Sequence, residues 1–261
     1  MGLSNVKMFH DGDSITVREI AGTIDHSLLR PDITTAELVE GCALAKEYHC
    51  VSVCVRPSDL PIVARELRDS GVLVTTVAAF PHGTATAESK VFETIDAIEK
   101  GAVEVDVVMN YARFLSGEFD YVQDELARVA AAAHGRGALL KVIFENHYLT
   151  GDQIAHACRI AEKAGVDFVK TSTGYAPSGS KIEDLKIMRA SVSPHIMVKS
   201  AGGVKTLDQA LADGAELVGG IPAADQNPRE HIDMVFTLAQ KYNVDVDMHI
   251  DETDRDRKSV V

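Results

Sequence analysis

The stretch LLKVIFENHYLTGDQIAHACRIAEKAGVDFVKTSTG at residues 139–174 decides the fold prediction, because it contains one complete strand, helix and strand. The β-rich runs LLKVIFEN and FVKTSTG lie at its two ends. Between them, Thr150 followed by Gln153 has the form of a capping box, in which two side chains satisfy backbone N–H groups at a helix start. Gly165 stands shortly before the second run, where a left-handed residue ends a helix.

The same unit recurs on both sides of this stretch. Similar capping pairs occur at Thr34 and Glu37, Ser180 and Glu183, and Thr206 and Gln209, and helix-ending glycines at Gly71, Gly101 and Gly214. Six further β-rich runs complete the pattern: Thr23–Leu28, Val51–Val55, Val72–Phe80, Val103–Asn110, His195–Gly203 and Glu216–Ile221.

Eight alternating strand and helix segments in one chain predict an α/β protein with a parallel sheet, and their number is that of a (β/α)8 TIM barrel. The alternative, an open doubly wound sheet, lacks its GxGxxG signature after the first strand. The 261 residues are enough for one large domain. We therefore expect an N-terminal extension at 1–20, a single barrel domain at 21–242, and a charged, flexible C-terminal tail at 243–261.

Composition excludes several classes of partner. The chain has 26 basic and 39 acidic residues, a net charge of −13, which disfavours binding to nucleic acid or to an anionic membrane. It has no apolar run of about 20 residues and no signal-peptide core at its start, so a cytoplasmic protein is expected. The four cysteines form no CxxC pair, and the histidines form no HExxH or HxH arrangement, so we expect reduced thiols and no metal site.

The strands carry charged residues where a barrel interior is usually apolar. In Val103–Asn110 the odd-numbered positions are apolar and suit the helices, which directs Glu104, Asp106 and Asn110 inward. The same alternation directs four more ionisable side chains inward: Lys141, Glu145, Lys170 and Lys199. These residues either neutralise one another in a structural ion-pair network or form an active site. For Lys141 or Glu104 taken alone, the two roles are equally supported.

The positions of two lysines favour the active site. Lys170 and Lys199 lie near the C-terminal ends of neighbouring strands, where barrel active sites are built. Two ammonium groups on adjacent strands repel each other, which favours the neutral form of one of them, and a neutral amine can form a Schiff base with a carbonyl. Charge alone does not decide which lysine attacks. An inward Asp106 can move the protons that imine chemistry requires.

Seven motifs extend this interpretation over residues 21–220: TIDHSLLRPDIT (23–34), VSVCVRP (51–57), VAAFPHG (77–83), KVFETIDAIEKGAVEVDVVMN (90–110), KVIFE (141–145), DFVKTSTGY (167–175) and VKSAGGVKT (198–206). With these motifs in this order, the sequence strongly resembles the deoxyribose-phosphate aldolase family. The resemblance implies an aldehyde-lyase that reversibly cleaves 2-deoxy-D-ribose 5-phosphate to acetaldehyde and D-glyceraldehyde 3-phosphate without a cofactor. The implied partners are these small molecules, with a homodimer or a higher homo-oligomer left open.

The resemblance also assigns roles to individual residues. Lys170 matches the Schiff-base lysine, Lys199 the second lysine that favours the neutral amine, and Asp106 the acid that transfers protons. Asp25 matches a position that supports the proton relay, although its carboxylate could equally bond a nearby backbone N–H.

The phosphate-binding end departs from the family pattern. Gly174, Gly202, Gly203 and Lys205 keep part of a phosphate cradle, whereas Leu217, Ile221 and Pro222 replace a cation, a hydroxyl and an N–H donor. The alternative function is therefore the same Schiff-base chemistry on a non-phosphorylated deoxysugar or hydroxyaldehyde. A non-catalytic barrel that binds sugar phosphates and a metal-dependent aldolase are more distant alternatives.

Overall fold

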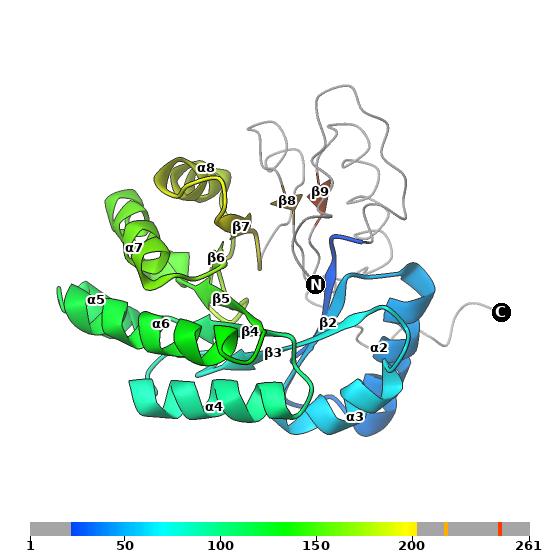
Figure 1. Ribbon diagram of the computed structural model, residues 1–261. Helices are drawn as coiled ribbons and strands as arrows, with labels where there is room; N and C mark the ends of the chain where they lie inside the picture. The colour runs from blue at the N-terminus through cyan, green and yellow to red at the C-terminus, as the bar shows by residue number, and fades with distance from the viewer. Residues whose placement is uncertain (1–21, 203–216, 219–244, 247–261) are drawn as a thin grey trace.

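The computed structural model describes residues 22–202, 217–218 and 245–246, and its main feature is a curled parallel sheet (Figure 1). Seven strands pair in chain order, each with the next and all parallel. They are β1 (Asp25–Leu28), β2 (Ser52–Val55), β3 (Leu73–Ala78), β4 (Glu104–Val108), β5 (Leu139–Ile143), β6 (Phe168–Lys170) and β7 (Met197–Lys199). All seven lie inside the ranges that the sequence predicts.

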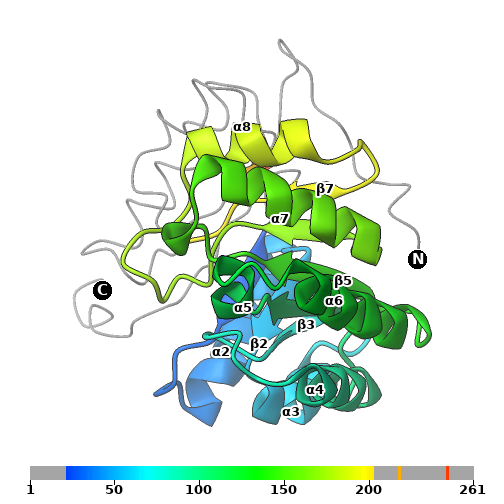
Figure 2. The same ribbon diagram turned by 90° about the vertical axis from the view of Figure 1, so that its left-hand side faces the viewer.

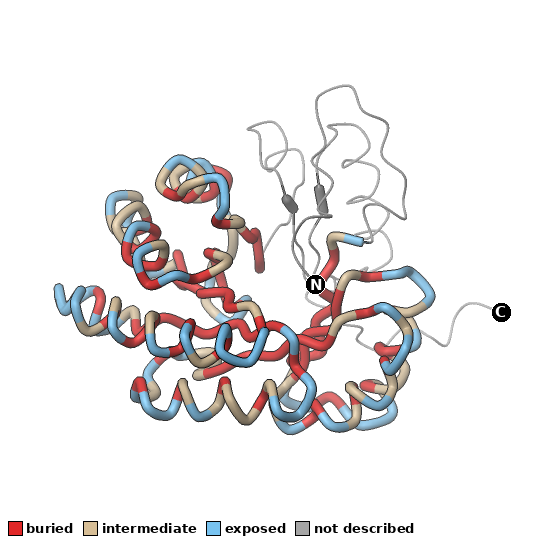
Figure 3. The backbone as a smooth tube through the Cα atoms, viewed as in Figure 1, coloured by how far each residue is buried: buried red, intermediate tan, exposed pale blue. Residues whose placement is uncertain are grey.

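Helices cover the convex side of this sheet (Figures 1 and 2). The α-helices are α2 (Thr35–Tyr48), α3 (Leu60–Glu66), α4 (Ala87–Glu99), α5 (Tyr111–Leu115), α6 (Phe119–His134), α7 (Gly151–Ala164) and α8 (Ile182–Ser191). Two short 3-10 helices, η1 (Pro57–Asp59) and η2 (Asn146–Tyr148), follow β2 and β5. The main core lies between the sheet and these helices, and Figure 3 shows that the strands are buried while the helices expose one side.

Two predicted helix starts and two predicted helix ends are confirmed. One of these ends is Gly101, which follows the C-cap residue of α4 with a positive φ of 108°. Thr34 and Thr150 each form a complete capping box, the first with Glu37 and the second with Gln153. Gly165 ends α7 in the left-handed conformation, with φ of 79°. These local signals fix where α2 and α7 begin and where the chain turns toward β6.

The predicted capping pair at Ser180 and Glu183 is wrong. Helix α8 begins at Ile182, and its N-cap residue, Lys181, makes no side-chain capping bond. The backbone N–H of Ser180 donates instead to Gly202 O at 2.7 Å, and its hydroxyl accepts from Ser200. Ser180 therefore connects the loops after β6 and β7. The pair at Thr206 and Gln209, and Gly214, lie outside the described residues.

Most strands end before the C-terminal limits that the sequence predicts. Strand β4 stops at Val108 because Asn110 caps α5, its side chain accepting from the N–H of Arg113. Ala79 after β3 and Glu145 after β5 have φ of 51° and 56°, which an extended strand does not allow. The residues at these strand ends therefore lie in loops at the carboxyl edge of the sheet.

The predicted eighth strand, Glu216–Ile221, contains β8 (Leu217–Val218). This strand contacts β7, and its hydrogen-bonded partner among the described residues is β9 (Asp245–Val246), which runs parallel to it. Strand β9 lies within the range 243–261 that the sequence assigns to the tail. The predicted domain boundaries at 20 and 242 lie in segments outside the described residues.

Candidate active site

The two lysines singled out in the sequence lie side by side at the carboxyl edge of the sheet. Lys170 is the last residue of β6 and Lys199 the last of β7, and the two are register partners. Each retains only 2% of its surface exposed. Asp106 lies on β4, opposite Lys141 on β5, and Asp25 lies on β1. The alternation of apolar and charged positions therefore predicts these inward side chains correctly. It is wrong for Asn110, which lies beyond the end of β4 and whose side chain caps α5 instead.

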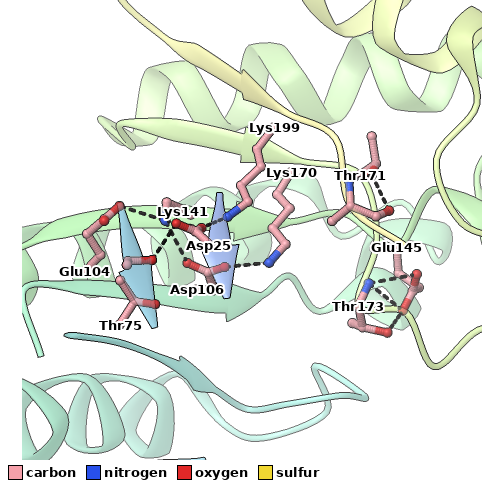
Figure 4. A network of polar contacts seen from close by, with 12 residues as sticks. Asp25, Thr75, Glu104, Asp106, Lys141, Glu145, Lys170, Thr171, Thr173 and Lys199 are labelled. Atoms are coloured by element: carbon pink, nitrogen blue, oxygen red, sulfur yellow. Dashed lines mark hydrogen bonds and ion pairs between the residues drawn. The ribbon is translucent and has the colours of Figure 1, made fainter. Parts of the chain in front are cut away.

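Each of these side chains has an oppositely charged partner (Figure 4). Lys170 Nζ donates to Asp106 Oδ2 at 2.6 Å, and Lys199 Nζ pairs with Asp25 Oδ2. Lys141 Nζ lies 2.7 Å from Glu104 Oε2, 3.1 Å from Asp25 Oδ2 and 3.7 Å from Asp106 Oδ1. Three lysines and three carboxylates thus form one buried network, which we call the charge cluster.

The three positive charges of the charge cluster are matched by three negative charges, which the sequence alone did not establish. Lys170 and Lys199 are neighbours, as predicted, but each ammonium group also contacts a carboxylate. The carboxylates offset the repulsion between the two lysines. Proton transfer from Lys170 to its own partner, Asp106, is therefore a direct route to a neutral amine.

The pKa of Asp106 reflects two opposed effects. Burial raises the pKa of this carboxyl, but the charges of Lys141 and Lys170 and their hydrogen bonds outweigh burial and hold the pKa below its usual value. Loss of the charge on Lys170 removes one of these two lysine contributions. Asp106 therefore becomes a better proton acceptor once Lys170 is neutral.

The sequence places Lys141 and Glu104 inside the barrel and leaves open whether their role is structural or catalytic. The structure gives Lys141 contacts to all three carboxylates of the charge cluster. Ser52 is a further residue that was missed, because its hydroxyl donates to Asp25 Oδ1 at 2.5 Å. Its position in the motif VSVCVRP was the available signal.

A second polar group lies just beyond the charge cluster, where Glu145 in the loop after β5 meets the loop after β6. The carboxylate of Glu145 accepts from the backbone N–H of Thr173 at 3.3 Å and also from its hydroxyl. Burial raises the pKa of Glu145, and the hydrogen bonds from Thr173 oppose this rise. Thr171 in the same loop exchanges hydrogen bonds with the backbone of Ala201, both at 3.0 Å. These contacts fix the segment that follows Lys170.

Two of the four residues predicted to bind phosphate come together. Gly174 and Gly202 have φ of 89° and 74°, and a Cβ added at Gly202 would lie 3.2 Å from the Cα of Gly174. The two backbones therefore pack closely because neither residue has a side chain. Gly203 and Lys205 lie outside the described residues, as do Ile221 and Pro222, while Leu217 is described only as part of β8.

Other functional groups give no competing site in the described part of the chain. The residues in that part include no cluster of three or more histidines, cysteines or acids able to hold a metal ion. Burial raises the pKa of the Cys54 thiol to about 12, so it stays protonated at neutral pH and serves as a small core residue. None of the described helices has the length and apolar character needed to cross a membrane.

Comparison with known proteins shows to which family the chain belongs. A model of the DeoC/LacD family of aldolases matches residues 20–222. The chain belongs to this family. It is similar to the deoxyribose-phosphate aldolase of Thermoanaerobacter sp. (strain X514), with 44% identity over 204 residues, 77% of this chain and 92% of that protein. The enzyme of the same name from Treponema denticola is 43% identical over 74% of this chain and 89% of that protein.

The chain is also similar to solved structures of deoxyribose-phosphate aldolases. A putative deoxyribose-phosphate aldolase from Coccidioides immitis matches with a TM-score of 0.73 and 36% identity, over 78% of this chain and 82% of that one. The Aeropyrum pernix deoxyribose-phosphate aldolase, described as a unique tetrameric structure, matches with a TM-score of 0.68 and 28% identity over 75% and 82%. With the chain-order parallel sheet, these matches confirm the (β/α)8 barrel, and the family membership confirms that the protein is an aldolase.

Proposed function

We propose that this protein is a class I aldolase that reversibly cleaves 2-deoxy-D-ribose 5-phosphate to acetaldehyde and D-glyceraldehyde 3-phosphate through a Schiff base on Lys170. The observation that carries the proposal is the 2.6 Å contact between Lys170 Nζ and Asp106 Oδ2 at the carboxyl edge of the sheet. It gives a buried amine a proton acceptor at the end of the barrel where active sites are built.

The first stage is formation of the Schiff base. Lys170 transfers a proton toward Asp106, and its neutral amine attacks the C1 aldehyde of the open-chain sugar to give a carbinolamine. Protonation of the carbinolamine hydroxyl lets water leave, and the nitrogen forms an iminium ion with C1. In this proposal Asp106 carries the protons in both steps, directly or through water. Lys199, paired with Asp25, keeps a second positive charge beside the reacting nitrogen.

The second stage is cleavage of the carbon–carbon bond. The C3 hydroxyl loses its proton to the Asp106 carboxylate or its water, and the electron pair of the C2–C3 bond moves into a C1–C2 double bond. The iminium nitrogen becomes neutral, so the products are glyceraldehyde 3-phosphate and an enamine of acetaldehyde on Lys170. Protonation of the enamine at C2 and hydrolysis release acetaldehyde. Asp106 therefore alternates between base and acid.

The substrate is tested by comparing kcat/KM for 2-deoxyribose 5-phosphate with kcat/KM for 2-deoxyribose. One charge-assisted hydrogen bond to the phosphate contributes about 1.5–3 kcal/mol, so the proposal expects a preference of about tenfold to 100-fold or more for the phosphate ester. Equal values for the two sugars would instead support the alternative, the same chemistry on a non-phosphorylated substrate. Leu217, Ile221 and Pro222 favour that alternative, because none supplies a phosphate donor from its side chain.

A pair of lysine variants tests the assignment of the nucleophile. Lys170→Met should remove the amine that forms the Schiff base, so no turnover of either sugar is expected. Lys163→Met on the exposed side of α7 is the matched control and should retain wild-type kcat/KM. Turnover by the Lys170 variant at the control rate would contradict the proposal.

We also propose that the enzyme forms a homo-oligomer. The Aeropyrum pernix relative, described as a tetramer, supports this assembly, and light scattering on the purified protein measures it. A cytoplasmic location is part of the same proposal, because the described cysteines are free thiols, as is usual in that compartment. Cell fractionation tests the location.

A further inference from the structure

The described residues leave a substrate bound to Lys170 one direction in which to extend. On the side toward the start of the strands, the interior is filled by the buried side chains of Glu104, Lys141 and Asp25. Lys170 itself is the last residue of its strand. The parts of the substrate remote from C1 must therefore extend beyond the carboxyl edge of the sheet, into the space among the loops that follow the strands.

Tyr175 lies in this space, five residues after Lys170. Its hydroxyl donates to Leu29 O at 3.0 Å, and its ring meets the ring of Phe80 edge to face, with centroids 5.4 Å apart. Leu29 directly follows β1, and Phe80 lies two residues after β3. In the sheet, β2 lies between β1 and β3, and in an eight-stranded barrel β2 is opposite β6. The Tyr175 side chain therefore reaches across the end of the barrel.

The backbone of Tyr175 is anchored on the side of β6. Its N–H donates to Thr173 Oγ1 at 3.1 Å, and Thr173 is in turn bound by the carboxylate of Glu145. Gly174, with φ of 89°, makes the turn between them. Tyr175 nevertheless keeps 50% of its surface exposed, so its ring is accessible to a molecule that arrives at the carboxyl edge.

We infer that Tyr175, packed against Phe80, is a specificity-determining residue whose ring limits the size of the aldehyde that reacts with the enzyme-bound donor. The inference rests on the proposed function, since it concerns the remote end of a substrate held at Lys170. The two rings form an aromatic wall, defined here as the side chains of Tyr175 and Phe80. The wall leaves room for a short acceptor and excludes a long or branched one.

The test uses the aldol addition of acetaldehyde to acceptors of increasing length, with propanal and hexanal as the two probes. In the Tyr175→Ala variant the ratio of kcat/KM for hexanal to that for propanal should rise about tenfold or more, the scale on which a pocket discriminates one or more methylene groups. Tyr175→Phe keeps the ring and loses the hydroxyl that donates to Leu29 O, so its ratio should stay near the wild-type value. An unchanged ratio in Tyr175→Ala would overturn the inference.

Two further variants separate the wall from general effects. Tyr148, in η2 after the neighbouring strand β5, has a similar exposure of 46% and stacks on Tyr111. The Tyr148→Ala variant should leave the hexanal-to-propanal ratio unchanged. Phe80→Ala should raise the ratio as Tyr175→Ala does, and the double variant should add little to either, because both remove one wall. Full additivity of the two effects, or an equal rise in Tyr148→Ala, would contradict a shared wall.

Trapping with borohydride distinguishes failure of the proposed function from failure of the inference about Tyr175. Wild type and Tyr175→Ala should both form a reduced acetaldehyde adduct on Lys170, because the wall does not take part in the covalent step. If wild type forms no adduct, the proposed function fails and the inference fails with it. If both proteins are trapped and the acceptor ratio is unchanged, the inference alone fails.

Discussion

The ion pair between Lys90 on α4 and Glu125 on α6 allows a quantitative prediction about stability. Both side chains are fully buried, and Lys90 Nζ lies 2.7 Å from Glu125 Oε2. Lys90 also donates to Val108 O at 2.8 Å, and Glu125 accepts from the N–H of Asn110 at 3.2 Å. The pair therefore holds the carboxyl end of β4, the strand that carries Asp106.

Burial affects the two partners in opposite directions. It lowers the pKa of Lys90 and raises the pKa of Glu125, and in each case the attraction of the partner only partly offsets burial. The charged form of each group is thus less favourable inside the protein than in water. Replacing one partner leaves an uncompensated buried charge and should lower the free energy of unfolding by about 3–5 kcal/mol.

The Glu125→Leu and Lys90→Met variants test this magnitude together with the double variant. The double variant removes both charges, so its free energy of unfolding should fall by much less than the sum of the two single losses, with a coupling of about 2 kcal/mol or more. Urea unfolding followed by circular dichroism, with linear extrapolation, measures all four proteins. If the two single losses simply add in the double variant, the conclusion that Lys90 and Glu125 neutralise each other's buried charge is refuted.

The pH dependence of Glu125→Leu gives an independent check. Burial already lowers the pKa of Lys90 in the wild-type protein, and the variant loses the attraction of Glu125 that partly opposes this shift. In the unfolded chain the lysine keeps its ordinary pKa of about 10.4. Between the two values the unfolded state binds more protons, so the stability of the variant should rise with pH by up to about 1.4 kcal/mol per unit. A variant whose stability deficit is the same at neutral and alkaline pH would contradict the assignment.

Three further predictions concern other residues. Burial lowers the pKa of His26 from 6.5 to about 4, so this residue contributes stability above pH 6.5 that is lost as pH falls through about 4. In acid unfolding experiments, the His26→Gln variant should therefore lose about 3 kcal/mol less stability over this pH range than the wild-type protein. Asp106→Asn should lower kcat by about 100- to 10,000-fold in steady-state assays because the proton carrier is gone, and a variant with full kcat would exclude Asp106 from proton transfer. Burial raises the pKa of each of the four cysteine thiols to about 11 or 12, namely Cys42, Cys50, Cys54 and Cys158. A thiol reagent at neutral pH should therefore label these cysteines only after the protein unfolds, and labelling of the native protein would contradict their burial.

The sequence predicts the strands well because their signals are local. Alternation of apolar and charged residues in β4 and β5 reports which face is buried, and it correctly directs Asp106 and Lys141 inward. The capping boxes at Thr34 and Thr150 are equally local, since each involves two side chains three residues apart. Such features depend on neighbouring residues and are therefore visible in one sequence.

Features that depend on distant residues were missed. Ser180 has the form of a helix cap, but its N–H bonds to Gly202 in the loop after β7, and no local pattern reports that contact. The balanced charge cluster is similar, because pairing of Lys199 with Asp25 joins β7 to β1. The sequence identified two neighbouring lysines, but only the structure shows that each also contacts a carboxylate.

The proposed reaction depends on a Schiff base at Lys170, and reductive trapping detects this covalent bond. The protein is incubated with acetaldehyde and borohydride, digested, and analysed by peptide mass spectrometry. If Lys170 is the nucleophile, an ethyl group is expected on Lys170, with Lys141 and Lys199 unmodified, and no adduct is expected in Lys170→Met. An ethyl group on Lys141 or Lys199 of the wild-type protein, or a wild-type protein that carries none, would contradict this assignment.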